Sequence, residues 1–206
     1  FMDALQRLLD LIASLNQQGI HISHLDLGGG LGIRYRDETP PLPSEWSSAL
    51  REQLGAFDGT IVIEPGRAIA GNAGILVSRV NYTKHSAEKN FAVVDAAMND
   101  LIRPALYDAW LEIIRVEQHS DEQERIYDII GAICETADFL GKDRSISLAP
   151  GDLIAIRSSG AYGFSMSSNY NTRNRAAEVM VDGARHYCIR EREVFADLVR
   201  GESMLP

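Results

Sequence analysis

Apolar residues in the first part of the chain alternate between helical and strand-like spacing. Between residues 2 and 18, leucine and isoleucine recur every three or four positions, as on one face of an α-helix, and Gly19 provides a stop. A second helical pattern covers residues 45–57, with Ser44 as a candidate N-cap. The expected strands are residues 22–27 and 61–63. Helices and strands in turn, with glycine or polar residues after each strand, are typical of a parallel α/β sheet or barrel.

From residue 74 onwards the pattern changes to short β-like runs separated by turns. The expected strands are residues 75–82, 91–95, 126–130, 153–157, 177–181 and 186–190. Hairpin-type turns are expected at Gly151-Asp152 and Asp182-Gly183, and helices at residues 101–110 and 194–198. We therefore expect an α/β segment over residues 1–73 and a mainly antiparallel β domain over residues 74–206.

Charge and hydropathy exclude several classes of protein. The 206 residues include 20 Lys and Arg against 29 Asp and Glu, a formal net charge of −9. The cations do not cluster, which argues against a nucleic-acid surface, because phosphate binding needs grouped positive charges. There is no apolar run of about 18 residues and no charged-then-apolar leader. These features predict a cytoplasmic protein that binds neither nucleic acid nor membrane.

Cysteine and histidine are too few and too scattered for a disulfide framework or a metal site. We predict that Cys188, which lies in a strand-like run, is an inert buried thiol. His119 and residues 120–125 belong to a stretch that we interpret as a polar loop.

The first unit has too few strands to be complete. A length of 206 residues corresponds to roughly 1.4 domains, and two strand–helix units cannot cover both faces of a parallel sheet. The chain opens at Phe1 directly on a helical pattern. We therefore expect a missing N-terminal segment that supplies the remaining strands.

Two glycine-containing turns follow the first two predicted strands. Gly28, Gly29 and Gly30 leave backbone amides accessible and suit a phosphate cradle, although a tight turn without a ligand explains them equally well. Ile33 breaks the dinucleotide fingerprint, which disfavours a nicotinamide cofactor. The second turn consists of Glu64, Pro65, Gly66 and Arg67. Its guanidinium could bind a carboxylate or a phosphate, or could simply pair with the glutamate.

Three further positions are candidates for ligand chemistry. Arg103 and Tyr107 lie four residues apart in a predicted helix and offer a cation and a phenol, although a surface ion pair is the alternative. The thiol of Cys134 can donate a proton near neutral pH, although most such cysteines are structural. Tyr162 stands between two glycines, where its ring can cover a neighbouring surface or serve as a buried anchor.

Five motifs in order resemble the diaminopimelate decarboxylase family over nearly the whole chain. They are residues 24–32 (HLDLGGGLG), 64–67 (EPGR), 99–107 (NDLIRPALY), 134–138 (CETAD) and 160–163 (GAYG). The resemblance corresponds to the second half of that family's protein. It implies the C-terminal part of a (β/α)8 barrel that binds pyridoxal 5'-phosphate (PLP), followed by a Greek-key-like β domain.

The resemblance also implies roles for individual residues. The turns at residues 28–30 and 64–67 would hold the PLP phosphate, and Tyr162 would contact both cofactor and substrate. The far end of meso-diaminopimelate would be bound by Arg67, Arg103, Tyr107 and Glu135. Cys134 would protonate the carbon that loses CO2, giving L-lysine, in a homodimer whose subunits share each active site.

One family residue has no match in this chain. The Schiff-base lysine of the family lies on an early barrel strand, whereas the only lysines are Lys84, Lys89 and Lys142, in other contexts. We therefore expect the chain to be inactive alone. Two alternatives stay open: a related PLP decarboxylase of ornithine, arginine or carboxynorspermidine, and a non-catalytic fragment that dimerises with a full-length partner.

Overall fold

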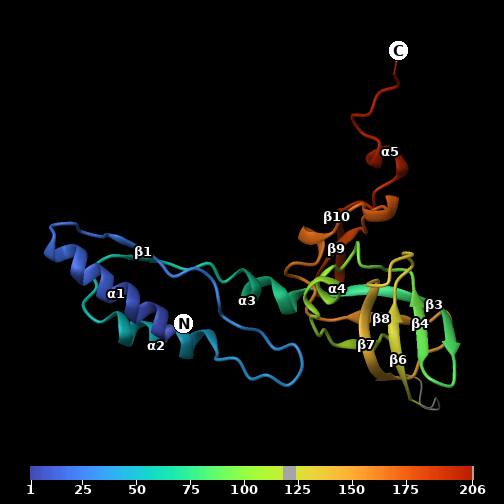
Figure 1. Ribbon diagram of the computed structural model, residues 1–206, viewed down its shortest axis with the longest axis horizontal. Coiled ribbons are helices and arrows are strands. Elements are labelled where there is room, and N and C mark those ends of the chain that lie inside the picture. Colours follow the sequence, from blue (N-terminus) through green and yellow to red (C-terminus); the bar gives the residue numbers. More distant parts are fainter. Residues whose placement is uncertain (118–123, 206) are drawn as a thin grey trace. The chain divides into compact units, whose positions relative to one another are not determined.

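The computed structural model describes residues 1–117 and 124–205 and divides into two compact units, Phe1–Asn72 and Ala73–Pro206 (Figure 1). The position of His119 and most of the predicted loop 120–125 lie outside the described residues. Each unit has its own arrangement of helices and strands.

The first unit is built on a two-stranded parallel sheet. Its elements are α1 (Met2–Gln17), β1 (His24–Asp26), α2 (Pro43–Leu54), β2 (Thr60–Val62) and α3 (Gly66–Ala70), and the 3-10 helix η1 (Gly71–Ala73) spans the boundary with the second unit. Strands β1 and β2 pair in parallel, in register from His24 opposite Thr60. The apolar faces of the helices meet the sheet in a core of Leu5, Ile12, Leu25 and Leu50. The helical spacing of the sequence is confirmed, because the same leucines and isoleucines form this core.

The start of α2 differs from the expectation. Ser44 lies inside the first turn, and the N-cap position is Leu42. Pro43 suits the first helical position because its fixed φ matches the helix and it has no N–H to satisfy. The backbone N–H of Leu42 instead donates to the Glu45 carboxylate at 2.8 Å.

The second unit contains a six-stranded, nearly closed mixed sheet. Its strands are β3 (Leu76–His85), β4 (Asn90–Val94), β5 (Ile113–Arg115), β6 (Arg125–Ile130), β7 (Phe139–Ile146) and β8 (Leu153–Ile156). Their order is β5-β8-β3-β4-β6-β7, and β5 and β7 at the two ends also contact each other. All neighbours are antiparallel except β4 and β6. The interior is fully buried at Val80, Val94, Ile129, Leu140 and Ile156.

The remaining elements of this unit are short. They are α4 (Arg103–Tyr107), η2 (Phe164–Met166), η3 (Tyr170–Thr172), β9 (Glu178–Asp182), β10 (Arg185–Arg190) and α5 (Phe195–Leu198). The predicted helix over residues 101–110 was too long, because Asp108 adopts a left-handed conformation (φ 51°) that ends α4. Gly151-Asp152 leads into β8 and does not join a hairpin, since β7 and β8 are not neighbours.

The hairpin of β9 and β10 corrects the prediction for Cys188. The turn at Asp182-Gly183 joins the two strands as expected. Every residue of β10 is exposed, however, and Cys188 with them. A strand in a two-stranded sheet has no second layer to bury it, so the apolar pattern of β10 did not indicate burial.

Candidate functional site

The two turns of the first unit lie side by side because β1 and β2 are parallel neighbours. The N–H of Leu27 donates to Val62 O at 3.0 Å, and the N–H of Glu64 donates to Gly28 O at 2.7 Å. A Cβ on Gly29 would lie 2.8 Å from Glu64 O, so only glycine permits this approach. The structure thus brings Gly28, Gly29 and Gly30 together with the turn at residues 64–67.

The backbone of these two turns is glycine-rich and open on one side. Gly28 and Gly30 have positive φ values of 65° and 109°. A Cβ built on Gly28 or Gly66 would meet no atom within 4 Å, so open space borders the backbone there. The N–H of Gly28 donates to Asp26 Oδ1 at 2.8 Å and that of Gly66 to Glu64 O at 2.9 Å, so these two amides are already engaged within the chain. Arg67 follows directly in the exposed first turn of α3.

In the second unit, α4 carries two of the predicted residues. Pro104 lies at the start of this helix, where its fixed φ is favourable. The guanidinium carbon of Arg103 lies 5.4 Å from the centre of the Tyr162 ring, a cation–π geometry. Tyr162 itself has φ 60° and is 42% exposed, and Tyr107 is 62% exposed. The Tyr162 ring therefore packs against the Arg103 guanidinium and remains partly exposed to solvent.

The loop over residues 131–138 is joined to the turn before α4 by one carboxylate. Asp138 is only 4% exposed. Its Oδ1 accepts a hydrogen bond from the backbone N–H of Met98 at 2.7 Å, and its Oδ2 accepts one from the backbone N–H of Ile133 at 2.6 Å. This loop presents Cys134 and Glu135, which are both exposed. Asp138 therefore fixes the loop that carries the predicted thiol and carboxylate beside the turn that leads to Arg103.

The turn before α4 contains a buried polar residue, Asn99, and a half-buried one, Asp100. Asn99 is 1% exposed, and its amide donates to Ser168 O at 3.3 Å. Asp100 accepts a hydrogen bond from the N–H of Ala97 at 3.0 Å. Burial raises the pKa of Asp100, while this hydrogen bond and the charge of Arg173 act in the opposite direction. The turn is thus held by polar contacts within itself and with Ser168.

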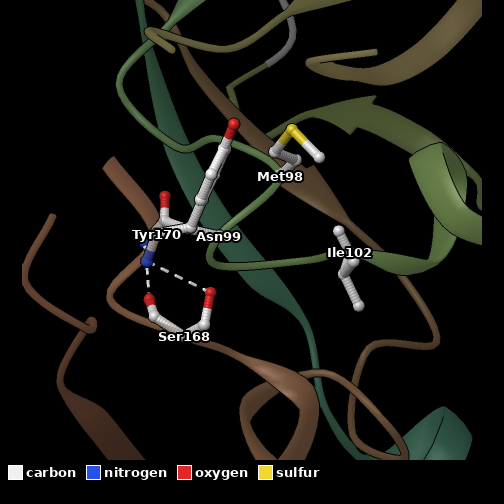
Figure 2. Close-up of a pocket in the computed structure, with 5 residues that line it drawn as sticks. All are labelled: Met98, Asn99, Ile102, Ser168 and Tyr170. Carbon is white, nitrogen blue, oxygen red and sulfur yellow. Dashed lines mark hydrogen bonds between the residues drawn. The ribbon is translucent and has the colours of Figure 1, made fainter. Parts of the chain in front are cut away.

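A cavity of about 290 Å³ opens beside this turn (Figure 2). Its lining residues are Met98, Asn99, Ile102, Ser168 and Tyr170. The hydroxyl of Tyr170 donates to Glu135 Oε2 at 3.3 Å. Ser168 and Tyr170 thus belong to the cavity lining, and Tyr170 contacts Glu135, one of the predicted site residues.

The predicted site residues fall into two sets. Those of the two phosphate-type turns belong to the first unit, and Arg103, Tyr107, Cys134, Glu135 and Tyr162 belong to the second. Sequence reasoning missed the linking roles of Asp138, Asn99 and Tyr170. The density of polar residues in 99–100 and 169–173 was the available signal, but polarity alone does not distinguish a solvated loop from a hydrogen-bonded one.

Residues 1–117 and 124–205 contain neither a cluster of metal-ligand side chains nor a membrane-spanning helix. No three His, Cys, Asp or Glu side chains gather there as metal ligands. Over the same residues, no helix has both the length and the apolar character required to span a membrane.

Comparison with known proteins identifies the family. The sequence profile of the pyridoxal-dependent decarboxylases, C-terminal sheet domain, matches residues 8–160. Diaminopimelate decarboxylases of Pseudomonas aeruginosa and Vibrio cholerae are 60% and 59% identical over the whole chain, which covers 49% of each relative. The chain thus spans about half the length of the curated relatives that it matches.

Solved structures of similar proteins support the same family. A protein from Aquifex aeolicus superimposes with a TM-score of 0.92 at 45% identity, covering 97% of this chain and 50% of that one. A diaminopimelate decarboxylase from Helicobacter pylori, complexed with L-lysine, gives 0.89 at 36% identity, covering 97% and 49%. The two curated relatives named above are diaminopimelate decarboxylases, and the chain belongs to the pyridoxal-dependent decarboxylase family.

Proposed function

We propose that this chain is the C-terminal portion of an enzyme that decarboxylates meso-2,6-diaminopimelate to L-lysine and CO2, the last step of lysine biosynthesis. The observation that carries the proposal is the pair of hydrogen bonds accepted by Asp138. They hold the Cys134-Glu135 loop beside the turn that leads to Arg103. A thiol and a carboxylate on this loop, with a guanidinium in the helix that follows the turn, suit a substrate with an ammonium and a carboxylate at its far end.

Pyridoxal phosphate is the cofactor named for this family. When bound, it accepts the electron pair released as the carboxylate leaves. The residues of this chain that would hold its phosphate are Gly28, Gly29, Gly30, Glu64, Pro65, Gly66 and Arg67. Their support is the open space beside Gly28 and Gly66, which leaves room for an anion next to the two turns. Tyr162, which is partly exposed, would contact cofactor and substrate.

The other residues would orient the substrate and move one proton. Arg67 and Arg103 would bind the distal carboxylate, with Tyr107 beside it, and Glu135 would bind the distal ammonium. Cys134 would donate the proton to the carbon from which CO2 departs. Its exposure on a loop supports a role in which the thiol of one subunit enters the site of a homodimeric partner.

The first unit is proposed to be the trailing part of the PLP-binding barrel, and the second its β domain. Val62 and Ile63, at the end of β2, are 39% and 40% exposed. Parallel sheets are normally covered on both faces. Uncovered apolar residues at a parallel strand therefore support further barrel strands beside this unit.

None of the three lysines suits the role of the cofactor-binding lysine. Lys89 forms a 2.6 Å ion pair with Asp128, whose hydrogen bond raises the pKa of Lys89, whereas a nucleophilic amine needs a lowered one. Lys142 lies over the ring of Phe139, and Lys84 is exposed on β3. We therefore expect the purified chain, given PLP and diaminopimelate, to release no L-lysine. Detection of L-lysine by chromatography would contradict this expectation.

The test of the function uses the complete enzyme that contains this chain. L-lysine and CO2 should form from meso-diaminopimelate faster than amine products form from ornithine, arginine or carboxynorspermidine. Arg103→Ala should raise KM for diaminopimelate about 10- to 100-fold with little change in kcat, because a charge-assisted contact to the non-reacting end is lost. Arg7→Ala, at an exposed arginine of α1, is the matched control. An unchanged KM, or a preference for ornithine, would contradict the proposal.

A further inference from the structure

Tyr170 contacts Glu135 and has no role in the function proposed above. Its hydroxyl donates to Glu135 Oε2 at 3.3 Å. In Figure 2 its side chain extends away from Ser168. Both partners are exposed side chains, 49% in the case of Tyr170. An exposed glutamate samples several rotamers, so a donor that selects one of them affects what the carboxylate can bind.

The segment that carries Tyr170 is anchored on its C-terminal side by Arg173. The Nε of Arg173 donates to Asn99 Oδ1 at 2.9 Å, and its Nη2 donates to the backbone oxygen of Asp95 at 2.6 Å. The same guanidinium lies 3.8 Å from Asp100. Arg173 therefore fixes the segment to the turn that Asp138 also fixes to the Glu135 loop.

A second anchor lies on the N-terminal side. The amide of Asn169 donates to Glu193 Oε2 at 2.6 Å, and Arg175 Nε donates to Glu193 Oε1 at 2.7 Å. These contacts, with that of Arg175 the largest, lower the pKa of Glu193 to about 2. Glu193 thus remains an ionised acceptor throughout the neutral range, and Tyr170 lies between two fixed neighbours.

The backbone of this segment is strained. Asn171 and Thr172 both have φ 59°. A left-handed conformation is unfavourable for a β-branched residue such as threonine, so the surrounding contacts must maintain it. The contacts on both sides of Tyr170 therefore hold its backbone, and with it the position of its side chain, in one conformation.

We propose that Tyr170 is a positioning residue that holds the Glu135 carboxylate in the orientation that receives the distal ammonium of diaminopimelate. The inference rests on the proposed function, which assigns that ammonium to Glu135. Tyr170 acts by restricting the rotamers of Glu135 before the substrate arrives, so that less conformational freedom is lost on binding.

The first measurement compares steady-state kinetics of the complete enzyme with and without Tyr170→Phe. This change keeps the ring and removes only the hydroxyl. KM for meso-diaminopimelate should rise about three- to tenfold, with kcat altered less than about twofold, because the contact concerns the non-reacting end. Tyr82→Phe, at an exposed tyrosine of β3, should change neither constant. An unchanged KM in Tyr170→Phe would overturn the inference.

A second measurement separates positioning of Glu135 from a general structural effect. D-2-Aminopimelate keeps both carboxylates but lacks the distal amino group, so its inhibition constant should be the same for the unsubstituted enzyme and Tyr170→Phe. An inhibition constant that rises as much as KM would overturn the inference. In a Glu135→Gln background, Tyr170→Phe should add no further rise in KM, and a full additive rise would also overturn it.

The same assays distinguish failure of the inference from failure of the function. If the unsubstituted enzyme releases L-lysine but Tyr170→Phe behaves like Tyr82→Phe, only the inference is wrong. If the unsubstituted enzyme releases no L-lysine from diaminopimelate, the proposed function is wrong and the inference falls with it.

Discussion

At the scale of single residues, Cys134 has the most specific proposed chemistry. It is an exposed thiol on a loop whose base is fixed by Asp138. Thiols lose a proton far more readily than aliphatic hydroxyls, so serine at this position would be a poor proton donor. The position needs a side chain that reaches the reacting carbon and can part with a proton there.

We therefore expect Cys134→Ser in the complete enzyme to lower kcat about 100-fold, the usual size of a general-acid contribution. PLP binding, followed by its absorbance, should not change, because the phosphate turns lie elsewhere in the chain. Cys188→Ser is the matched control, since Cys188 is also exposed but lies on β10. Turnover equal to that of the unsubstituted enzyme would remove Cys134 from the mechanism.

At the scale of elements, one buried carboxylate determines how two loops meet. Asp138 uses each of its oxygens for a different backbone N–H, that of Met98 and that of Ile133. Asparagine has nearly the same shape but offers only one oxygen. One backbone N–H would then face an amide NH2 in a buried place, which costs about 1 to 3 kcal/mol.

Asp138→Asn should accordingly lower the stability of the complete enzyme by that amount and raise KM for diaminopimelate. Thermal unfolding and steady-state kinetics measure the two effects. Asp143→Asn is the control, because Asp143 is 73% exposed and its ion pair with Lys89 is long, at 3.9 Å. Should Asp138→Asn match the control in both measurements, the two loops are held together by other contacts.

The elements also show what could be predicted from sequence. The leucine spacing of α1 was sufficient, because one helix face packs on one core. Strand β7 was missed because its middle reads Gly141-Lys142-Asp143-Arg144, a turn-like composition at an irregular part of its pairing with β6. The three-residue strand β5 was too short to give a period.

The proposed site also contains residues that the sequence indicates and contacts that it does not. Glycines and charged residues in short motifs indicated Gly28 to Gly30, Arg103 and Cys134, because unusual local chemistry is visible in sequence. The contacts of Asp138 and Tyr170 were not visible, because they join segments that are 40 and 35 residues apart. Long-range hydrogen bonds depend on the fold, and no local pattern encodes them.

At the scale of the whole molecule, the residues proposed to hold the cofactor's phosphate and the proposed proton donor belong to different units of the chain. Arg67 lies within residues 1–72 and Cys134 within residues 73–206. In a homodimer whose subunits share their active sites, each site would combine Arg67 of one subunit with Cys134 of its partner. This arrangement can be tested without a structure of the assembly.

Two inactive complete enzymes, one with Cys134→Ala and one with Arg67→Ala, should recover activity when their subunits are mixed and allowed to exchange. A mixed dimer would contain one site with both residues intact and one with neither, so random exchange should restore about a quarter of the original activity. Release of L-lysine from diaminopimelate measures it, and each variant unfolded and refolded alone is the control. If both residues of a site came from the same subunit, every site would keep one substitution, and mixing would restore nothing. Recovery would therefore establish that the Cys134 loop of one subunit works with the phosphate turns of its partner.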